Sequence, residues 1–254
     1  MKQVMFNWER IGKSLLQETK KSREDINGIL EKIEFLASEC GEITSNRRML
    51  NRIGKILIIQ NSITVLVPCC QTLKSGSKIL VERHLTFLQK VSKIIPSIIP
   101  LFLVADHESE DASLCSAIGK TQEEFRLMAL QSLRDIALII KPFNWKVALM
   151  SETIQNLIQC ENETAQWIAG EKQFKARLIT EMVARENLYN NIYQAKQMTI
   201  EGKMKRTIKT AAQYVVMGNF ADKNNFLICN HTTSNLTWYL QTKAAILHNQ
   251  IIPY

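Results

Sequence analysis

The chain has 254 residues, a formal net charge of +8, and 46% hydrophobic and 22% charged residues, which is ordinary for a globular protein. Its 9 glycines and 5 prolines are too few for the many turns of an all-β protein of this length. No apolar run reaches the ~20 uninterrupted residues of a membrane-spanning helix, because residues 53–70 are interrupted by Lys55 and Pro68, and residues 94–105 are fewer and contain prolines. We expect a cytoplasmic protein, with a peripheral place at a membrane as the alternative.

A long first helix is predicted over residues 4–40. Apolar or small residues recur there at alternating steps of four and three, which places them on one seam of a helix, as in bundles and coiled coils. Gly41 is well placed to end this helix. The seam residues are Leu15, Thr19, Ser22, Ile26, Ile29, Ile33, Leu36 and Cys40.

Two further helices are predicted before residue 96. One begins near Thr44 and continues through an apolar run over residues 56–67 until Pro68, which cannot continue a helix. The other covers residues 71–95. The apolar segments 56–67 and 94–104 fit either a protein core or an amphipathic face at a membrane, and the sequence leaves both interpretations open.

The middle of the chain contains a predicted loop and two predicted helices. Residues 106–111 are acidic and lack apolar side chains, which predicts an exposed loop. Thr121 and Glu124 have the spacing of a capping box, which predicts a helix over residues 122–140. Another helix is predicted over residues 145–160. In the 122–140 helix the residues expected to face inward are Phe125, Met128, Leu133, Ile136 and Ile140.

The longest helical stretch is predicted over residues 163–217. Unbroken, its 55 residues would span about 80 Å, more than the width of a compact domain, so we expect an elongated molecule or a break at Gly202. A loop follows over residues 218–225, and a last helix over residues 232–250.

These elements together predict an all-α fold. We expect an elongated multi-helix bundle of about six or seven helices. It would form a single helical domain over residues 1–254, with a possible sub-boundary near residues 105–120.

The net charge is concentrated in one span of the chain. Residues 44–93 contain nine basic residues and one acidic residue, Glu82, so nine minus one equals the whole formal excess of +8. Basic side chains along helices attract phosphates and anionic membrane surfaces, which predicts an anion-binding surface. Its predicted members are Arg47, Arg48, Arg52, Lys55, Lys74, Lys78, Arg83, Lys90 and Lys93, with a second cluster of Lys203, Lys205, Arg206 and Lys209.

We find no pattern typical of a catalytic or metal site. The sequence has no phosphate-binding glycine-rich loop, no G-x-S-x-G and no H-E-x-x-H motif, and its six cysteines lack zinc-ligand spacing. We therefore predict no cofactor, no metal and no enzymatic activity.

These observations favour a structural or assembly protein of the viral matrix or nucleoprotein physical type. It would self-associate into a homo-oligomer through its helix seams and bind RNA or a negatively charged membrane through the basic span. Two alternatives are a helical adaptor that binds protein partners through those seams, and a pore-forming protein that inserts its apolar segments into a membrane.

Overall fold

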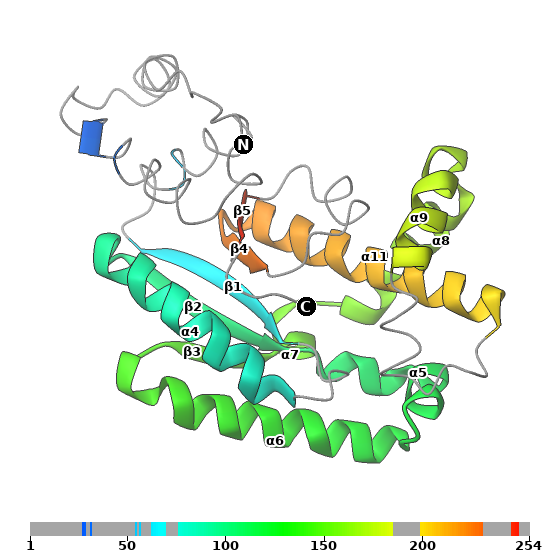
Figure 1. Cartoon of the computed structure of the whole chain (residues 1–254), viewed down its shortest axis with the longest axis horizontal. Coiled ribbons are helices and arrows are strands. Elements are labelled where there is room, and N and C mark those ends of the chain that lie inside the picture. Colours follow the sequence, from blue (N-terminus) through cyan, green and yellow to red (C-terminus); the bar gives the residue numbers. More distant parts are fainter. Residues whose placement is uncertain are drawn as a thin grey trace.

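The computed structural model describes residues 27–28, 31, 54, 56, 62–69, 76–184, 199–230 and 245–248. These residues form an α/β fold, so the predicted all-α bundle is wrong (Figure 1). A parallel β-sheet lies at the centre and helices surround it. In chain order the elements are β1 (Ile63–Cys69), α4 (Gly76–Ile94), β2 (Ile98–Val104), η2 (Asp106–Glu110), α5 (Ala112–Ala117), α6 (Gln122–Ile140), η3 (Lys141–Phe143), β3 (Lys146–Leu149), α7 (Met150–Thr153), α8 (Leu157–Gly170), η4 (Lys172–Phe174), α9 (Lys175–Ala184), α11 (Ile200–Lys223), β4 (Leu227–Asn230) and β5 (Ala245–His248).

In the described part of the chain the sheet has five parallel strands, in the order β3-β2-β1-β4-β5. Strands β1 and β2 pair along their whole length, from Ile63 opposite Ile98 to Cys69 opposite Val104. Parallel strands covered on both faces are almost continuously apolar rather than alternating. Of the two apolar segments predicted as 56–67 and 94–104, residues 63–67 therefore belong to strand β1 and residues 98–104 form strand β2, and both strands contribute to the core.

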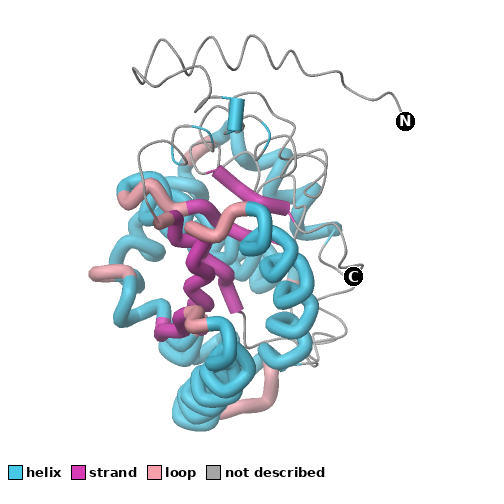
Figure 2. The backbone as a smooth tube through the Cα atoms, turned by 90° about the vertical axis from the view of Figure 1, so that its left-hand side faces the viewer, coloured by secondary structure: helices cyan, strands magenta, loops and turns pink. Residues whose placement is uncertain are grey.

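Helices cover both faces of this sheet, as Figure 2 shows. From β1 to β2 to β3 the chain moves outward in one direction, and right-handed crossovers place α4 and α6 on the same face. From β3 to β4 the chain crosses back past β1, which places α11 on the other face. Successive strands are therefore added on one side of β1 up to β3 and on the other side from β4 onward, so the strand order changes direction between β1 and β4.

The main core lies between the sheet and its helices. Phe87 of α4 and Phe102 of β2 are fully buried in it. A second, smaller core joins α8, α9 and α11 around Ile168 and Phe174. Burial of apolar surface on both sides of the sheet stabilises this layered arrangement.

Two of the predicted helices are confirmed. Helix α4 lies within the predicted 71–95, and α6 has the predicted limits, 122–140. The capping box is present: the Glu124 amide donates to Thr121 Oγ1 at 3.1 Å, and the Thr121 amide donates to Glu124 Oε2 at 2.8 Å. Met128, predicted to face inward, is instead exposed, whereas Phe125 and Ile136 are buried.

The other described helix predictions need correction. The predicted helix 145–160 is β3, α7 and the start of α8. The long 163–217 helix is divided where α8 ends at Gly170 and where Thr199 caps α11 by accepting from the Gly202 amide. Gly202 therefore lies inside a helix and does not break one. Residues 245–248 form a strand rather than part of a last helix.

Most of the predicted first helix, 4–40, lies outside the described residues, as does most of the span 44–61; residues 27, 28, 31, 54 and 56 are helical. Among the described helices, none has the length and apolar character needed to cross a membrane.

Candidate functional site

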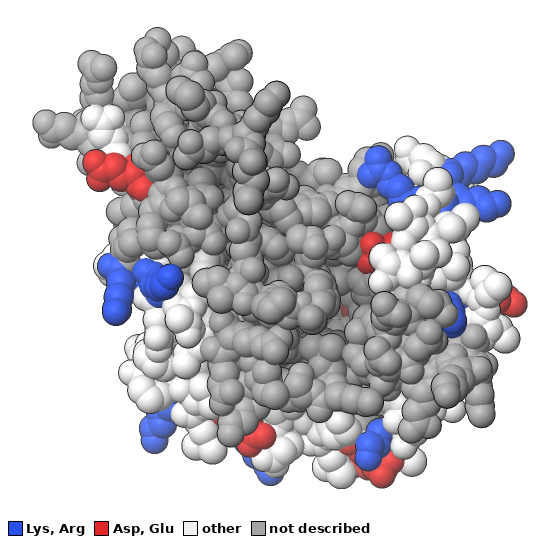
Figure 3. All heavy atoms as spheres, in the orientation of Figure 1, with Lys and Arg blue, Asp and Glu red and all other residues white. Residues whose placement is uncertain are grey.

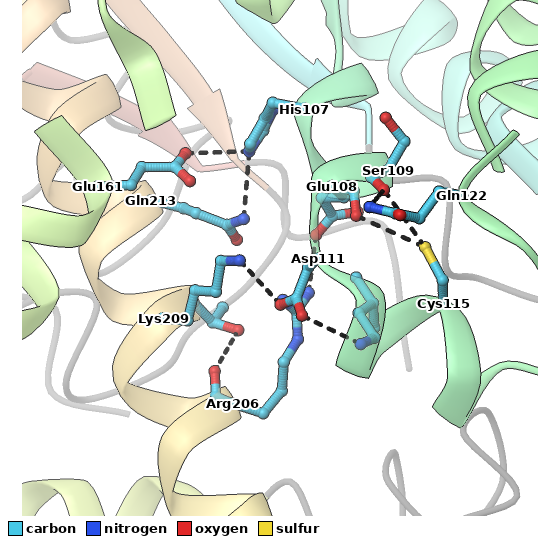
Figure 4. Close-up of polar contacts among 12 residues, drawn as sticks. His107, Glu108, Ser109, Asp111, Cys115, Gln122, Glu161, Arg206, Lys209 and Gln213 are labelled. Atoms are coloured by element: carbon cyan, nitrogen blue, oxygen red, sulfur yellow. Dashed lines mark hydrogen bonds and ion pairs between the residues drawn. The ribbon is translucent and has the colours of Figure 1, made fainter. Parts of the chain in front are cut away.

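A buried polar cluster lies where the chain leaves the carboxyl end of β2. All strands are parallel, so their carboxyl ends meet at one edge of the sheet, here called the carboxyl edge. Figure 4 shows side chains from η2, α8 and α11 converging there. The carboxyl-edge cluster is defined as His107, Glu108, Asp111, Glu161, Arg206, Lys209 and Gln213.

The backbone after β2 is fixed to both neighbouring strands. The Ala105 amide donates to the carbonyl of Cys69 at 3.0 Å, which joins the ends of β2 and β1. Asp106 accepts from the Ser151 amide at 3.0 Å and from the Ser151 hydroxyl, which joins the ends of β2 and β3. The short helix η2 therefore begins from a fixed point and aims its side chains inward.

Arg206 of α11 pairs with carboxylates that follow β2. Its Nη2 lies 2.7 Å from Glu108 Oε1, and its Nη1 lies 3.6 Å from Asp111 Oδ2. Lys209, one turn later, donates to Asp111 Oδ2 at 2.8 Å. Arg206 and Glu108 are buried, so the interaction occurs in a region of low effective dielectric, where unpaired charges are costly.

His107 joins η2 to two helices. Its Nε2 lies 2.9 Å from Glu161 Oε1 of α8, with both side chains 2% exposed, and the Gln213 amide of α11 contacts the same nitrogen at 3.1 Å. Burial lowers the pKa of His107, but the carboxylates of Glu161, Glu108 and Asp106 outweigh burial, and the net pKa is raised. The charges of these neighbouring carboxylates favour the imidazolium form.

The remaining side chains around η2 hold its backbone. The Cys115 thiol of α5 lies 3.6 Å from the Ser109 carbonyl, and Gln122 donates to the same carbonyl at 3.0 Å. Burial, followed by the charge of Asp111, raises the pKa of the Cys115 thiol. Cys115 therefore supports η2 as a neutral thiol and is poorly suited to act as a nucleophile.

The predicted basic residues are distributed over several regions. Lys90 and Lys93 are exposed on α4, Lys205 is exposed on α11, and Lys203 is half-buried on α11. On the face drawn in Figure 3, the described Lys and Arg side chains lie at separate places rather than in one patch. Arg47, Arg48, Arg52, Lys55 and Lys74 lie outside the described residues, and the side chains of Lys78 and Arg83 are not described.

Arg206 and Lys209, predicted to bind an external anion, are instead bound to carboxylates of this chain. Binding of RNA or of an anionic membrane by the other predicted residues stays a prediction.

The sequence missed the carboxyl-edge cluster. Residues 106–111 were predicted to be an exposed loop, but His107, Glu108 and Ser109 are buried. The available signal was a short apolar run, 98–105, followed directly by polar residues, a pattern that fits a buried strand and its carboxyl end but also fits a short buried helix. Within the described ranges, no group of three or more His, Cys, Asp or Glu side chains is arranged to hold a metal ion.

Comparisons with known proteins place this geometry in a wider context. No family model matches the chain, and no curated protein matches it. The fold is similar to the crystal structure of a tyrosyl-tRNA synthetase from Archaeoglobus fulgidus complexed with L-tyrosine, with a TM-score of 0.52 and 15% sequence identity. The match covers 87% of this chain and 64% of the synthetase chain, so this chain spans less than two thirds of that protein.

This similarity concerns the fold, and it overturns the predicted function class. The interpretation as a viral matrix or nucleoprotein type of assembly protein combined self-association through helix seams with binding through the basic span of residues 44–93. The chain instead has a parallel sheet with the architecture seen in a synthetase.

Proposed function

We propose that this chain binds a small zwitterionic ligand at the carboxyl edge of its sheet, and that an amino acid, L-tyrosine first, is the ligand to test. The observation that carries the proposal is the strand order β3-β2-β1-β4-β5, which reverses direction between β1 and β4. In open α/β sheets, ligands bind outside the carboxyl ends of the strands at such a reversal.

The choice of an amino acid rests on the fold comparison and on the charges of the edge. The synthetase with the similar fold is described as complexed with L-tyrosine. In the described part of the carboxyl-edge cluster, the cations Arg206 and Lys209 are paired with Glu108 and Asp111. Neutralised cations favour a ligand of little net charge over a polyphosphate, which needs uncompensated positive charge.

Isothermal titration calorimetry with L-tyrosine, L-phenylalanine and ATP tests the proposal directly. We expect saturable heat with L-tyrosine at concentrations up to about 1 mM, the upper end of common enzyme substrate constants. Absence of binding by all three ligands would refute a small-molecule site of this kind. Saturable binding of ATP alone would replace the amino acid with a nucleotide.

A matched pair of variants locates the site. Gln213→Ala alters α11 where it meets His107, whereas Gln131→Ala alters the exposed face of α6. We expect Gln213→Ala to weaken binding several-fold and Gln131→Ala to leave it unchanged. Equal affinities in both variants would place the ligand elsewhere. Binding alone is proposed here, and the absence of enzymatic activity stays a prediction.

A further inference from the structure

We propose that the His107–Glu161 pair is a proton-dependent latch, in which protonated His107 holds α8 against the carboxyl edge and loss of the proton releases α8. The pair joins η2, directly after β2, to the first half of α8 through a contact of 2.9 Å. Both side chains are 98% buried, since each is 2% exposed, so water cannot replace the contact.

Charge balance within the cluster supports a protonated histidine. The paired groups are the cations Arg206 and Lys209 and the anions Glu108, Asp111 and Glu161. Among these pairs, two positive charges face three negative charges, and an imidazolium at His107 supplies a third positive charge beside Glu161. A neutral ring would leave the Glu161 carboxylate buried without a cation, which is strongly unfavourable.

Among the residues that the structure describes, the other groups around the ring are negative, neutral or already paired. Asp106 and Glu108 of η2 are negative and add to the attraction for a proton. From α11, Gln213 presents a neutral amide, and Arg206 and Lys209 are bound to Glu108 and Asp111. From α5 and α6, Cys115 and Gln122 contact the η2 backbone.

The pair meets through one ring nitrogen, and its contact is an ion pair rather than a well-aligned hydrogen bond. Within the described part of the chain, His107 Nδ1 and Glu161 Oε1 are both buried and neither has a partner that meets hydrogen-bond geometry, whereas Nε2 and Oε1 lie 2.9 Å apart. The attachment of the ring to its surroundings therefore depends on Nε2, which faces Glu161 and Gln213. Weakening of the Nε2 contact leaves no second ring contact to hold η2 and α8 together.

The direction of the pH effect follows from linkage. The pKa of His107 in the folded chain lies above its ordinary value of 6.5, so the folded state binds the proton more tightly than the unfolded state. The latch therefore contributes fully below pH 6.5, and its contribution is lost as the pH rises through the folded pKa. Mildly alkaline conditions open α8, whereas acid conditions keep it closed.

Hydrogen exchange of α8 amides, measured from pH 6.5 to about 9 and expressed as protection factors, tests this inference without any ligand. Between the unfolded and folded pKa values of His107, protection in the wild-type chain should fall by up to about tenfold per pH unit. His107→Gln keeps a donor toward Glu161 but cannot titrate, so its α8 protection should be independent of pH. Glu161→Gln should also remove the pH dependence, and Glu163→Gln, on the exposed face of α8, should retain it.

A histidine NMR titration of the wild-type chain gives a second, variant-independent readout. We expect His107 to titrate above 6.5 and to titrate lower in Glu161→Gln. Titration at or below 6.5, or α8 protection in the wild type that does not change with pH, would overturn the latch even if a variant fails to fold. Retention of the full pH dependence in His107→Gln would also overturn it. The inference does not depend on the proposed ligand, so either can fail alone.

Discussion

Arg206 of α11 and Glu108 of η2 form a buried ion pair, with 2.7 Å between Nη2 and Oε1, across 98 residues of sequence. The pair attaches the longest described helix to the segment that follows strand β2. Because both charges are removed from water, each depends on the other, and the loss of one partner leaves an uncompensated buried charge.

Arg206→Met should therefore destabilise the chain strongly. We expect a loss of about 3–5 kcal/mol, the usual effect of removing one partner of a buried pair, measured by urea unfolding. The double variant Arg206→Met, Glu108→Gln should recover part of the loss, because no charge is then left at Glu108. If the loss of stability in the double variant equalled the sum of the losses in Arg206→Met and Glu108→Gln, the two residues would not be coupled.

Lys209 and Lys205 offer a matched comparison on the same helix. Lys209 is 28% exposed and donates to Asp111, whereas Lys205 is exposed. We expect Lys209→Met to cost about 0.5–1 kcal/mol, since solvent screens a partly exposed pair, and Lys205→Met to change stability by less than about 0.5 kcal/mol. A larger effect at Lys205 would mean that the exposed cation has a stabilising role.

Phe102 tests the position of the core. This side chain is fully buried in β2 and stacks with Trp145 at a ring-centroid distance of 6.2 Å. Phe102→Ala should cost about 3–5 kcal/mol through lost burial and a residual cavity. Leu138→Ala, at a position 72% exposed on α6, should change the free energy of unfolding by less than about 0.5 kcal/mol. Comparable losses of unfolding free energy in both variants would be incompatible with a core between the sheet and the helices that cover it.

The capping box of α6 gives a prediction about local stability and pH. Hydrogen bonds from the Thr121 backbone and side chain lower the pKa of Glu124. The ionised Glu124 carboxylate therefore stabilises the folded state near neutral pH, and this stabilisation is lost as the pH falls through the carboxyl range. Thr121→Ala should cost about 1 kcal/mol, seen as a lower Tm. The decrease in Tm on acidification that Glu124 causes should also be smaller in Thr121→Ala. An unchanged dependence of Tm on pH would contradict a capping box in which Thr121 and Glu124 bind each other.

Cys115 should resist alkylation in the folded chain. Its side chain is buried and its pKa is raised by burial and by Asp111, and the thiolate is the form that reacts. Peptide mapping after treatment with iodoacetamide at pH 8 should show Cys115 unmodified until denaturant is added. Rapid modification of Cys115 under native conditions would show that α5 opens readily.

Local signals in the sequence predicted the helices that depend on local contacts. The α6 boundaries follow from a cap between Thr121 and Glu124, three residues apart. The α4 helix follows from apolar spacing in a single segment. Such features need no knowledge of the rest of the chain.

The sheet could not be predicted in the same way. Each of β1 and β2 is seven residues long, and a short apolar run cannot be distinguished from a buried helical segment by periodicity alone. Pro68 was interpreted as the end of a helix, yet it lies within strand β1, and Pro100 likewise lies within strand β2. The long apparent helix also concealed the break at Thr199.

The carboxyl-edge cluster was still further from what a single sequence reveals. Its pairs connect residues about fifty to more than one hundred positions apart, such as His107 with Glu161 and His107 with Gln213. A polar segment such as 106–111 normally indicates solvent exposure. Only the partners from α8 and α11 make burial of these charges possible.

The pairing of Val65 with Leu227 has a consequence for biosynthesis. The two residues are 227 − 65 = 162 positions apart, which at ~5–20 residues per second means that roughly 10–30 s of translation separate them. During that interval the edge of β1 that later pairs with β4 lacks its described partner strand, and an unpaired apolar edge is a template for association with other chains. Expression yield should therefore depend on chaperones that shield this edge on the ribosome.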